Sequence, residues 1–459
     1  MNIPHVNRVT LLYVIFCLTG LFASDPFDRL RFNRHSFIAS STLIDSIGFS
    51  PTLKISTSKK DSVVFVQFIS TALVYNNIPD FRTGVLVSGS RDNYSFMIEP
   101  VIVNDIYGEH VLGTDYARSN LSGRIENASI LFNKDNLTVQ FGRSSIWWGQ
   151  SFTSSIIQSG LYPSYDHLLI QLHLWDFYLE LMGGQLGSEK MTDGSRIKRH
   201  IAGHRLSWNP NKNIILVFGE QIIYTGVNRG FELIYFNPFV PYFFTGLEGD
   251  EETEPEDNDN SILFAYGRYK LNSNSSIYGE IIVDDFQVDQ TGRDHALGYK
   301  MGFDGRSSLL DKNFTWFLEW TKIDPWTYIH HGQYTSWQNR GHSIGFPYGP
   351  DSECMQVQVM GDFGKEFYLF CDLVYLKKGS NHLETEWENT TIHTADRLNE
   401  DYFFSQFSVI KNYKWGSIEG GWSFKPFPNT IAADNSLFPE SGSVFLKLMM
   451  VLNKEFNLK

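Results

Sequence analysis

The feature that most constrains this chain is an alternation of apolar and polar residues that repeats from one segment to the next. In residues 262–271 one face carries no charge, whereas the other carries cations such as Arg268 among aromatic side chains. Residues 277–286 repeat the pattern and place Glu280 on their charged face. A period of two residues is typical of β-strands whose two faces meet different surroundings. We expect these segments to form an antiparallel hairpin that brings Arg268 near Glu280.

Segments of this kind follow one another between residues 63 and 452, and they include 137–148 and 328–337. In residues 314–321 the alternation places large aromatic side chains and a leucine on one face and Glu319 on the other. Such faces suit either a soluble β-sandwich with a buried core or a membrane barrel with a lipid-facing wall. The strands alone leave both architectures open.

The connections between the strands favour the barrel. Short turns rich in Asn and Asp are expected at residues 133–136, 209–213, 272–274 and 311–313. Long connections are expected at residues 149–167, 183–198, 239–260, 286–295 and 377–401. Alternation of tight turns with long loops is typical of transmembrane barrels. The sequence therefore predicts an all-β fold, a transmembrane antiparallel β-barrel with short periplasmic turns and long extracellular loops.

The N-terminus has the pattern of an export signal. Arg8 precedes the apolar residues 11–22, which are followed by small residues and then by polar ones. The apolar run is too short to span a bilayer comfortably. We expect a cleaved signal peptide at residues 1–23, an N-terminal periplasmic lead-in segment at 24–62 and the barrel at 63–459.

Charge and motifs argue against several functions. The formal net charge is −13 and no basic stripe is present, which argues against a nucleic-acid partner. The sequence contains no nucleophile elbow, phosphate loop, zinc-protease helix or CxxC pair. We therefore predict that the protein is not an enzyme and holds no metal, although paired carboxylates such as Glu220 and Glu232 could hydrolyse a glycosidic bond if they were held at the right separation. The acidic stretch 248–259 could gather Ca²⁺, but it lacks the spacing of a known calcium loop and is more simply a solvated charge run.

Two cysteines, Cys354 and Cys371, follow the expected signal peptide. A disulfide is possible in an oxidising compartment. Alternation places Cys354 on the face of Gln356 and Cys371 on the face of Leu373. Side chains on opposite faces of a sheet cannot be bridged without a register shift. Whether these cysteines pair stays open.

Aromatic residues next to polar and charged residues give the clearest candidate binding site. Sugar rings stack on flat apolar faces, while carboxylate, amide and guanidinium groups bind their hydroxyls. For each single aromatic residue, the interfacial belt of a barrel is the alternative explanation. The polysaccharide-binding candidates are Arg143, Trp147, Trp148, Glu220, Tyr224, Arg229, Glu232, Tyr235, Asn237, Asp284 and Asp285.

Several motifs resemble those of the Wzi-type capsule-assembly outer-membrane proteins, in particular a divergent, Bacteroidetes-like branch. They are FGRSSIWWGQ at residues 141–150, GHRLSW at 203–208, GEQIIYTGVNRGFELIYFNPF at 219–239, DN at 259–260 and IYGEIIVDDFQ at 277–287. The resemblance covers roughly residues 137–287. Its family-like positions also include His204, Arg205 and Glu280.

The resemblance implies a barrel of about eighteen strands in the bacterial outer membrane. It implies a lectin that binds and anchors capsular or exported polysaccharide during capsule assembly, without catalysis and without a cofactor. The expected partners are capsular polysaccharide or exopolysaccharide, outer-membrane lipid and the barrel-insertion machinery. The alternative is an outer-membrane porin or sugar-diffusion channel, which would need an open lumen.

Overall fold

The structure is a computed structural model that describes residues 62–75, 78–104, 116–118, 121–190, 194–227, 229–242, 259–285, 295–329, 333–385, 400–424 and 443–458. The expected signal peptide and nearly all of the lead-in segment lie outside these residues. So does most of the acidic stretch 248–259.

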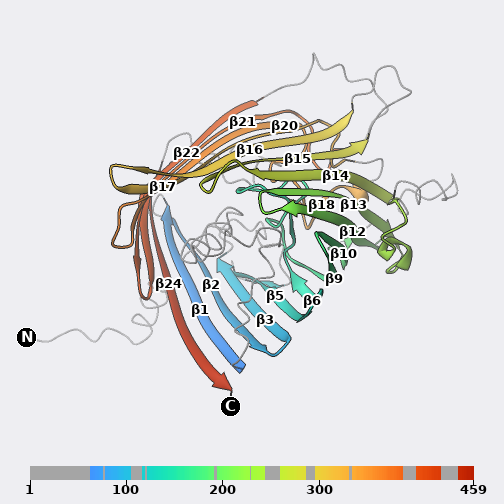
Figure 1. Ribbon diagram of the computed structural model, residues 1–459, viewed down its shortest axis with the longest axis horizontal. Coiled ribbons are helices and arrows are strands. Elements are labelled where there is room, and N and C mark those ends of the chain that lie inside the picture. The colour runs from blue at the N-terminus through green and yellow to red at the C-terminus, as the bar shows by residue number, and fades with distance from the viewer. Residues whose placement is uncertain are drawn as a thin grey trace, which may run out of the picture.

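The described chain forms a closed antiparallel β-barrel (Figure 1). The main sheet contains twenty strands, of which β4 (Tyr116–Arg118) and β11 (Glu189–Lys190) are short, so eighteen form the wall. The wall strands are β1 (Ser62–Tyr75), β2 (Ile78–Arg91), β3 (Tyr94–Asn104), β5 (Leu121–Lys134), β6 (Leu137–Ser144), β9 (Tyr165–Leu174), β10 (Phe177–Gln185), β12 (Arg196–Asn211), β13 (Ile214–Gly226), β14 (Asp259–Lys270), β15 (Ser275–Asp285), β16 (Ala296–Leu309), β17 (Lys312–Ile323), β20 (Ser352–Asp362), β21 (Phe367–Lys378), β22 (Glu400–Tyr413), β23 (Gly416–Phe424) and β24 (Ser443–Leu458). Pairing of β1 with β24 closes the barrel and confirms the predicted fold class.

The two ends of the barrel differ in the length of their connections. At one end the wall strands are joined by tight turns, and Asp92, Asp135 and Asp311 there have positive φ values of 53°, 52° and 59°. Short polar side chains tolerate this left-handed backbone. Most connections at the other end are long, as between β13 and β14, although β1 ends at Tyr75 and β2 already begins at Ile78. We call these the turn end and the loop end, and by the usual arrangement of such barrels the turn end is periplasmic.

The two faces of the wall differ as the alternation predicted. Large apolar side chains point outward, such as Phe218, which is 62% exposed, and Leu263, which is 47% exposed. Buried polar side chains including Glu180, Lys300 and Glu319 point into the lumen. Among the described residues, no helix is long and apolar enough to cross a membrane.

Three local predictions were wrong. In the predicted strand 328–337, the described residues 328–329 and 333–337 form no wall strand, because they belong to the long connection after β17 and include the short helix η3 (Gln333–Thr335). The predicted strand 137–148 ends at Ser144 in β6. The pairing register places Arg268 opposite Tyr278, not opposite Glu280, and Arg268 instead forms an ion pair with Asp304 at 2.5 Å.

Both cysteines of the described chain are free, and Cys354 is buried while Cys371 is partly exposed. Cys354 lies opposite Leu376 and Cys371 lies opposite Val359. This register agrees with the prediction that their side chains occupy opposite faces of the sheet.

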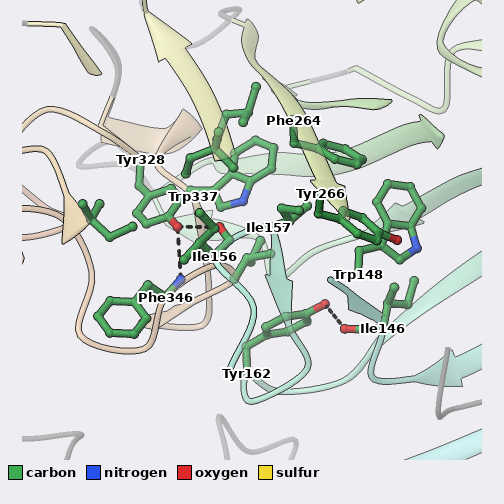
Figure 2. Packing of buried hydrophobic residues seen from close by; sticks show 14 of the residues in the cluster. Ile146, Trp148, Ile156, Ile157, Tyr162, Phe264, Tyr266, Tyr328, Trp337 and Phe346 are labelled. Carbon is green, nitrogen blue, oxygen red and sulfur yellow. Dashed lines mark hydrogen bonds between the residues drawn. The ribbon is translucent and has the colours of Figure 1, made fainter. Parts of the chain in front are cut away.

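Two long connections fold inward and pack against each other in the lumen (Figure 2). One is residues 145–164, with β7 (Trp147–Trp148) and β8 (Gln158–Ser159), and the other includes residues 324–329 and 333–351, with β18 (Gln338–Asn339) and β19 (His342–Ser343). The Tyr328 hydroxyl donates a hydrogen bond to the Ile156 carbonyl at 2.5 Å, and the Ser159 amide donates one to the Ile344 carbonyl at 2.8 Å. We call this pair of connections the plug.

Candidate functional site

The predicted site residues do not form one pocket, because they occupy both faces of the wall. Trp148 belongs to the plug and packs in the lumen against Phe264, with ring centroids 5.6 Å apart. Glu220 and Tyr224 alternate with the luminal residues of β13, so their side chains lie on the outer face with Phe218.

A row of polar residues crosses six neighbouring strands near the loop end. Strand pairing places these residues side by side on the outer face: Arg143, Asp166, Gln185, His200, Tyr224 and Asp259. We call them the polar row. The Arg143 guanidinium contacts the Asp166 carboxylate at 2.7 Å, and the Asp166 side chain is 62% exposed. Arg143 therefore lies where its strand leaves the apolar wall.

Next to Tyr224 and Asp259 of the polar row, Arg229 lies at the centre of an ionic cluster. Its guanidinium forms an ion pair with Glu232 at 2.7 Å and another with Asp259. The Tyr235 hydroxyl donates to Asp259 at 2.5 Å, and the Arg229 guanidinium lies 5.0 Å from the centroid of the Tyr224 ring. The side chains of Arg229 and Glu232 are 19% and 35% exposed. Four predicted residues are thus brought together, of which Arg229 and Glu232 reach solvent whereas Tyr224 and Tyr235 are buried.

The protonation states of this cluster are fixed by their surroundings. Burial lowers the pKa of Arg229, but its hydrogen bonds to Glu232 and Asp259 outweigh that effect and raise the pKa above its ordinary value. Burial, followed by the Asp259 carboxylate, raises the pKa of Tyr235 well above its ordinary range. Arg229 therefore stays charged and Tyr235 stays a hydrogen-bond donor at any physiological pH.

Three other predicted residues lie apart from this cluster. Asn237 is exposed, and its side-chain oxygen accepts a hydrogen bond from the Phe239 amide at 3.1 Å. Asp284 accepts a hydrogen bond from the Tyr328 amide at 2.5 Å and so holds the plug. Asp285 lies at a register shift between β15 and β16.

Trp147 and Trp148 form β7 inside the plug. Trp148 is fully buried, and the Arg205 guanidinium lies 4.8 Å from the centroid of its ring. Arg205 in turn forms an ion pair with Glu180 at 2.9 Å. Trp147 is only partly buried, so of the two tryptophans it is the one with surface left to contact a ligand.

Within the described residues, no group of three or more His, Cys, Asp or Glu side chains is arranged to hold a metal ion. The acidic stretch 248–259, considered above as a possible Ca²⁺ site, lies outside the described residues except for Asp259. Asp259 forms an ion pair with Arg229.

The profile of the capsule assembly protein Wzi matches residues 73–415 of this chain. The chain belongs to the Wzi capsule assembly family. Together with the closed barrel, this membership places the protein in the outer membrane. A search of curated proteins found no match.

Among solved structures, the Wzi family chain is similar to Wzi of Escherichia coli, described as an outer membrane protein involved in group 1 capsule assembly and a carbohydrate-binding β-barrel. The two share 16% identity over 88% of this chain and 86% of that one, with a TM-score of 0.56. This likeness shows the fold. OprD of Pseudomonas aeruginosa gives 9% identity over 86% and 96% with a TM-score of 0.45, and OccAB4 of Acinetobacter baumannii gives 8% over 87% and 100% with a TM-score of 0.47.

Sequence reasoning missed the groups that hold the plug of this Wzi family member. The Glu280 carboxylate accepts hydrogen bonds from the amides of Gln150, Ser151 and Ile156 at 2.7, 3.0 and 2.9 Å. Glu319 binds the next part of the same connection. The alternation placed both carboxylates in the lumen, but nothing local in the sequence indicates which loop reaches them.

Glu319 is the centre of a buried network. It forms an ion pair with Lys300 at 3.1 Å, and both side chains are almost fully buried. It also accepts hydrogen bonds from the Ser151 hydroxyl and the Phe152 amide at 2.7 Å and from the Tyr278 hydroxyl at 2.5 Å. The Lys300 ammonium donates to the Ser154 carbonyl at 2.7 Å. These contacts fix the plug to β15, β16 and β17.

We expect Tyr235→Phe to loosen the ionic cluster without unfolding the barrel. The variant loses the hydroxyl that bridges Asp259 and Arg229, and such a hydrogen bond to a charged group contributes about 1.5–3 kcal/mol. Amide hydrogen exchange should show faster exchange in residues 229–242. Tyr413→Phe, at an exposed ring near the turn end, is the matched control. Unchanged protection of residues 229–242 would contradict the role given to Tyr235.

Proposed function

We propose that this protein binds exported polysaccharide at the loop end of the barrel and so anchors capsule at the cell surface. Membership of the capsule assembly family and the outer-membrane barrel support this proposal. The proposal assigns no catalytic step to the barrel. Insertion by the barrel-insertion machinery remains a prediction.

The plug is the feature that favours a binding protein over a channel. A diffusion channel needs a continuous aqueous path, whereas here two connections pack on one another inside the wall and bury Tyr162, Tyr328 and Trp337. Buried Glu280 and Glu319 fix one of these connections by several hydrogen bonds each. This arrangement favours recognition at the outer end over diffusion through the lumen.

Among the predicted residues, the exposed polar ones at the loop end are the proposed sugar contacts. Arg143 with its partner Asp166, and Glu232 beside Arg229, present charged groups that can bind sugar hydroxyls. Trp147 offers a partly exposed ring for stacking. We assign the buried Trp148, Glu220, Tyr224 and Tyr235 to holding these groups in place. We assign Asp284 to holding the plug, and Asn237 and Asp285 stay candidate contacts.

The test is binding of the purified protein to capsular polysaccharide from its own cells. The wild-type protein should bind, and a double variant with Arg143→Gln and Asp166→Asn should bind at least about tenfold more weakly, a change of about 1.4 kcal/mol. Arg306→Gln, an exposed arginine near the turn end, should bind as the wild type does. Absence of wild-type binding, together with full capsule retention in a deletion strain, would overturn the proposal.

A further inference from the structure

We propose that the exposed apolar side chains of residues 229–242, which we call the outer loop, are seated in the outer leaflet of the membrane with lipid hydrocarbon as their partner, while the Arg229 and Glu232 ion pair of this loop stays at the aqueous edge. The inference concerns the outer wall and does not depend on polysaccharide binding. The outer loop comprises the short helix η2 (Leu233–Phe236) and its flanking residues.

The outer loop lies on the outside of the barrel. Gly183 shares its face with the outward-pointing Phe177 of β10, and the rings of Phe231 and Phe236 occupy the space that a Cβ at Gly183 would need. On the neighbouring strands, Tyr235 and Tyr242 bury the outward residues Ala202 and Ile222. The outer loop therefore covers the wall at β10, β12 and β13.

The outer face of the wall beneath the outer loop carries a polar pair, His204 and Glu220, at a height where the neighbouring outward side chains are apolar. His204 contacts Glu220 at 2.8 Å, and both lie four residues below the polar row on their strands. Four residues of strand extend about 13 Å, or roughly 10 Å of depth at a tilt of about 40°. Pairing flanks them with Leu181 on one side and Leu263 on the other.

The outer loop covers this polar pair and exposes apolar side chains on its own outer surface. The Tyr242 amide donates to the Glu220 carboxylate at 2.9 Å, and the Tyr242 ring packs edge-on against His204 at 4.7 Å. A carboxylate facing hydrocarbon without partners would be costly, so the outer loop separates it from lipid. The outer loop itself exposes Leu233 by 79% and Phe239 by 88%.

Continuity with the lipid-facing wall identifies the partner. Phe231 and Ile234 of the outer loop are 47% and 40% exposed, and the outward residues that follow or pair with the covered His204 and Glu220 are also large and apolar: Leu206, Phe218 and Leu263. A contiguous exposed apolar surface marks a membrane or protein contact. Because this one continues the face that a barrel turns to hydrocarbon, we assign it to lipid and not to a second copy of the chain.

The test is site-directed spin labelling of the full-length protein in lipid nanodiscs. Leu233→Cys and Phe239→Cys are labelled in a background with Cys371→Ser, while buried Cys354 is kept. Power saturation then compares relaxation by oxygen, which partitions into lipid, with relaxation by a water-soluble nickel chelate. Phe218→Cys, on the outward wall, is the lipid control, and Ser273→Cys, in a tight turn, is the water control.

We expect both outer-loop labels to resemble the label at position 218, with oxygen relaxing them several-fold more effectively than nickel. Stronger relaxation by nickel, as at position 273, would overturn the proposal. Protection from both reagents with a short distance between two labels would overturn it in favour of a second copy. Because both replaced side chains are exposed, the variants should keep the heat resistance of the wild-type barrel in detergent gels, which checks their folding.

Discussion

Glu319→Leu should lower the free energy of unfolding by about 3–5 kcal/mol, because it leaves the buried ammonium of Lys300 without its ion-pair partner. The variant also removes the carboxylate that accepts hydrogen bonds from the Ser151 hydroxyl and the Phe152 amide. Denaturant unfolding of the detergent-solubilised protein measures this loss. Planar-bilayer conductance should rise as well, because this carboxylate holds one connection of the plug.

Glu319→Gln tests the contribution of the negative charge alone, because glutamine has nearly the same shape as glutamate. It keeps an acceptor oxygen for the plug and should cost less than the leucine variant. Glu366→Gln removes a carboxylate of the same type from an exposed position in the turn before β21 and should leave both stability and conductance unchanged. If Glu319→Leu unfolds at the wild-type denaturant concentration and stays closed in bilayers, the network does not hold the plug.

Gly203→Val should displace β7 from the lumen. A Cβ at Gly203 would lie 2.9 Å from ring carbons of Trp148 and 2.9 Å from Cγ of Gln221, closer than real Cβ atoms approach such neighbours. Overpacking of a filled interior typically costs about 1–3 kcal/mol. We expect a lower melting temperature and a larger bilayer conductance, since the buried Trp148 must leave its site next to Arg205.

A second strand glycine provides the control for this variant. A Cβ at Gly420 would have its nearest neighbour, Cδ1 of Leu446, at 3.8 Å, which is ordinary contact. Gly420→Val should therefore keep the melting temperature within a few degrees and the conductance at the wild-type value. An equal loss at both positions would mean that loss of a strand glycine, and not collision with Trp148, causes the effect.

The barrel could be predicted from the sequence because its signals are local. Alternation within each strand assigned Glu280 and Glu319 to the lumen and Phe314 to the outer face, and the Asp-containing turns marked one end. Apart from the closing pair of β1 and β24, each wall strand pairs with the wall strands that precede and follow it in the chain, so local signals suffice for most of the wall. The family motifs then gave the approximate number of strands.

The site could be predicted only in part, because its arrangement depends on distant contacts. Residues 328–337 have the alternation of a strand but become part of the plug, since Tyr328 binds Ile156 from the other connection. The motif at 219–239 contains Tyr224, Arg229 and Tyr235, and the structure brings these three side chains together. The motif could not indicate that this segment folds over the outside of the wall, away from Trp148. A loop that packs on the outer face and a loop that packs in the lumen can have the same residue pattern.

The connection between β6 and β9 finds its acceptors on strands that are synthesised much later. The Ser151 hydroxyl is separated from Glu319 by 168 residues, and the Gln150 amide from Glu280 by 130. Contacts of such large sequence separation form late, since the intervening chain must first be ordered. The first strands of the barrel must therefore assemble around a connection that is still hydrated. Water leaves this connection only when β15 and β17 join the wall and supply Glu280 and Glu319.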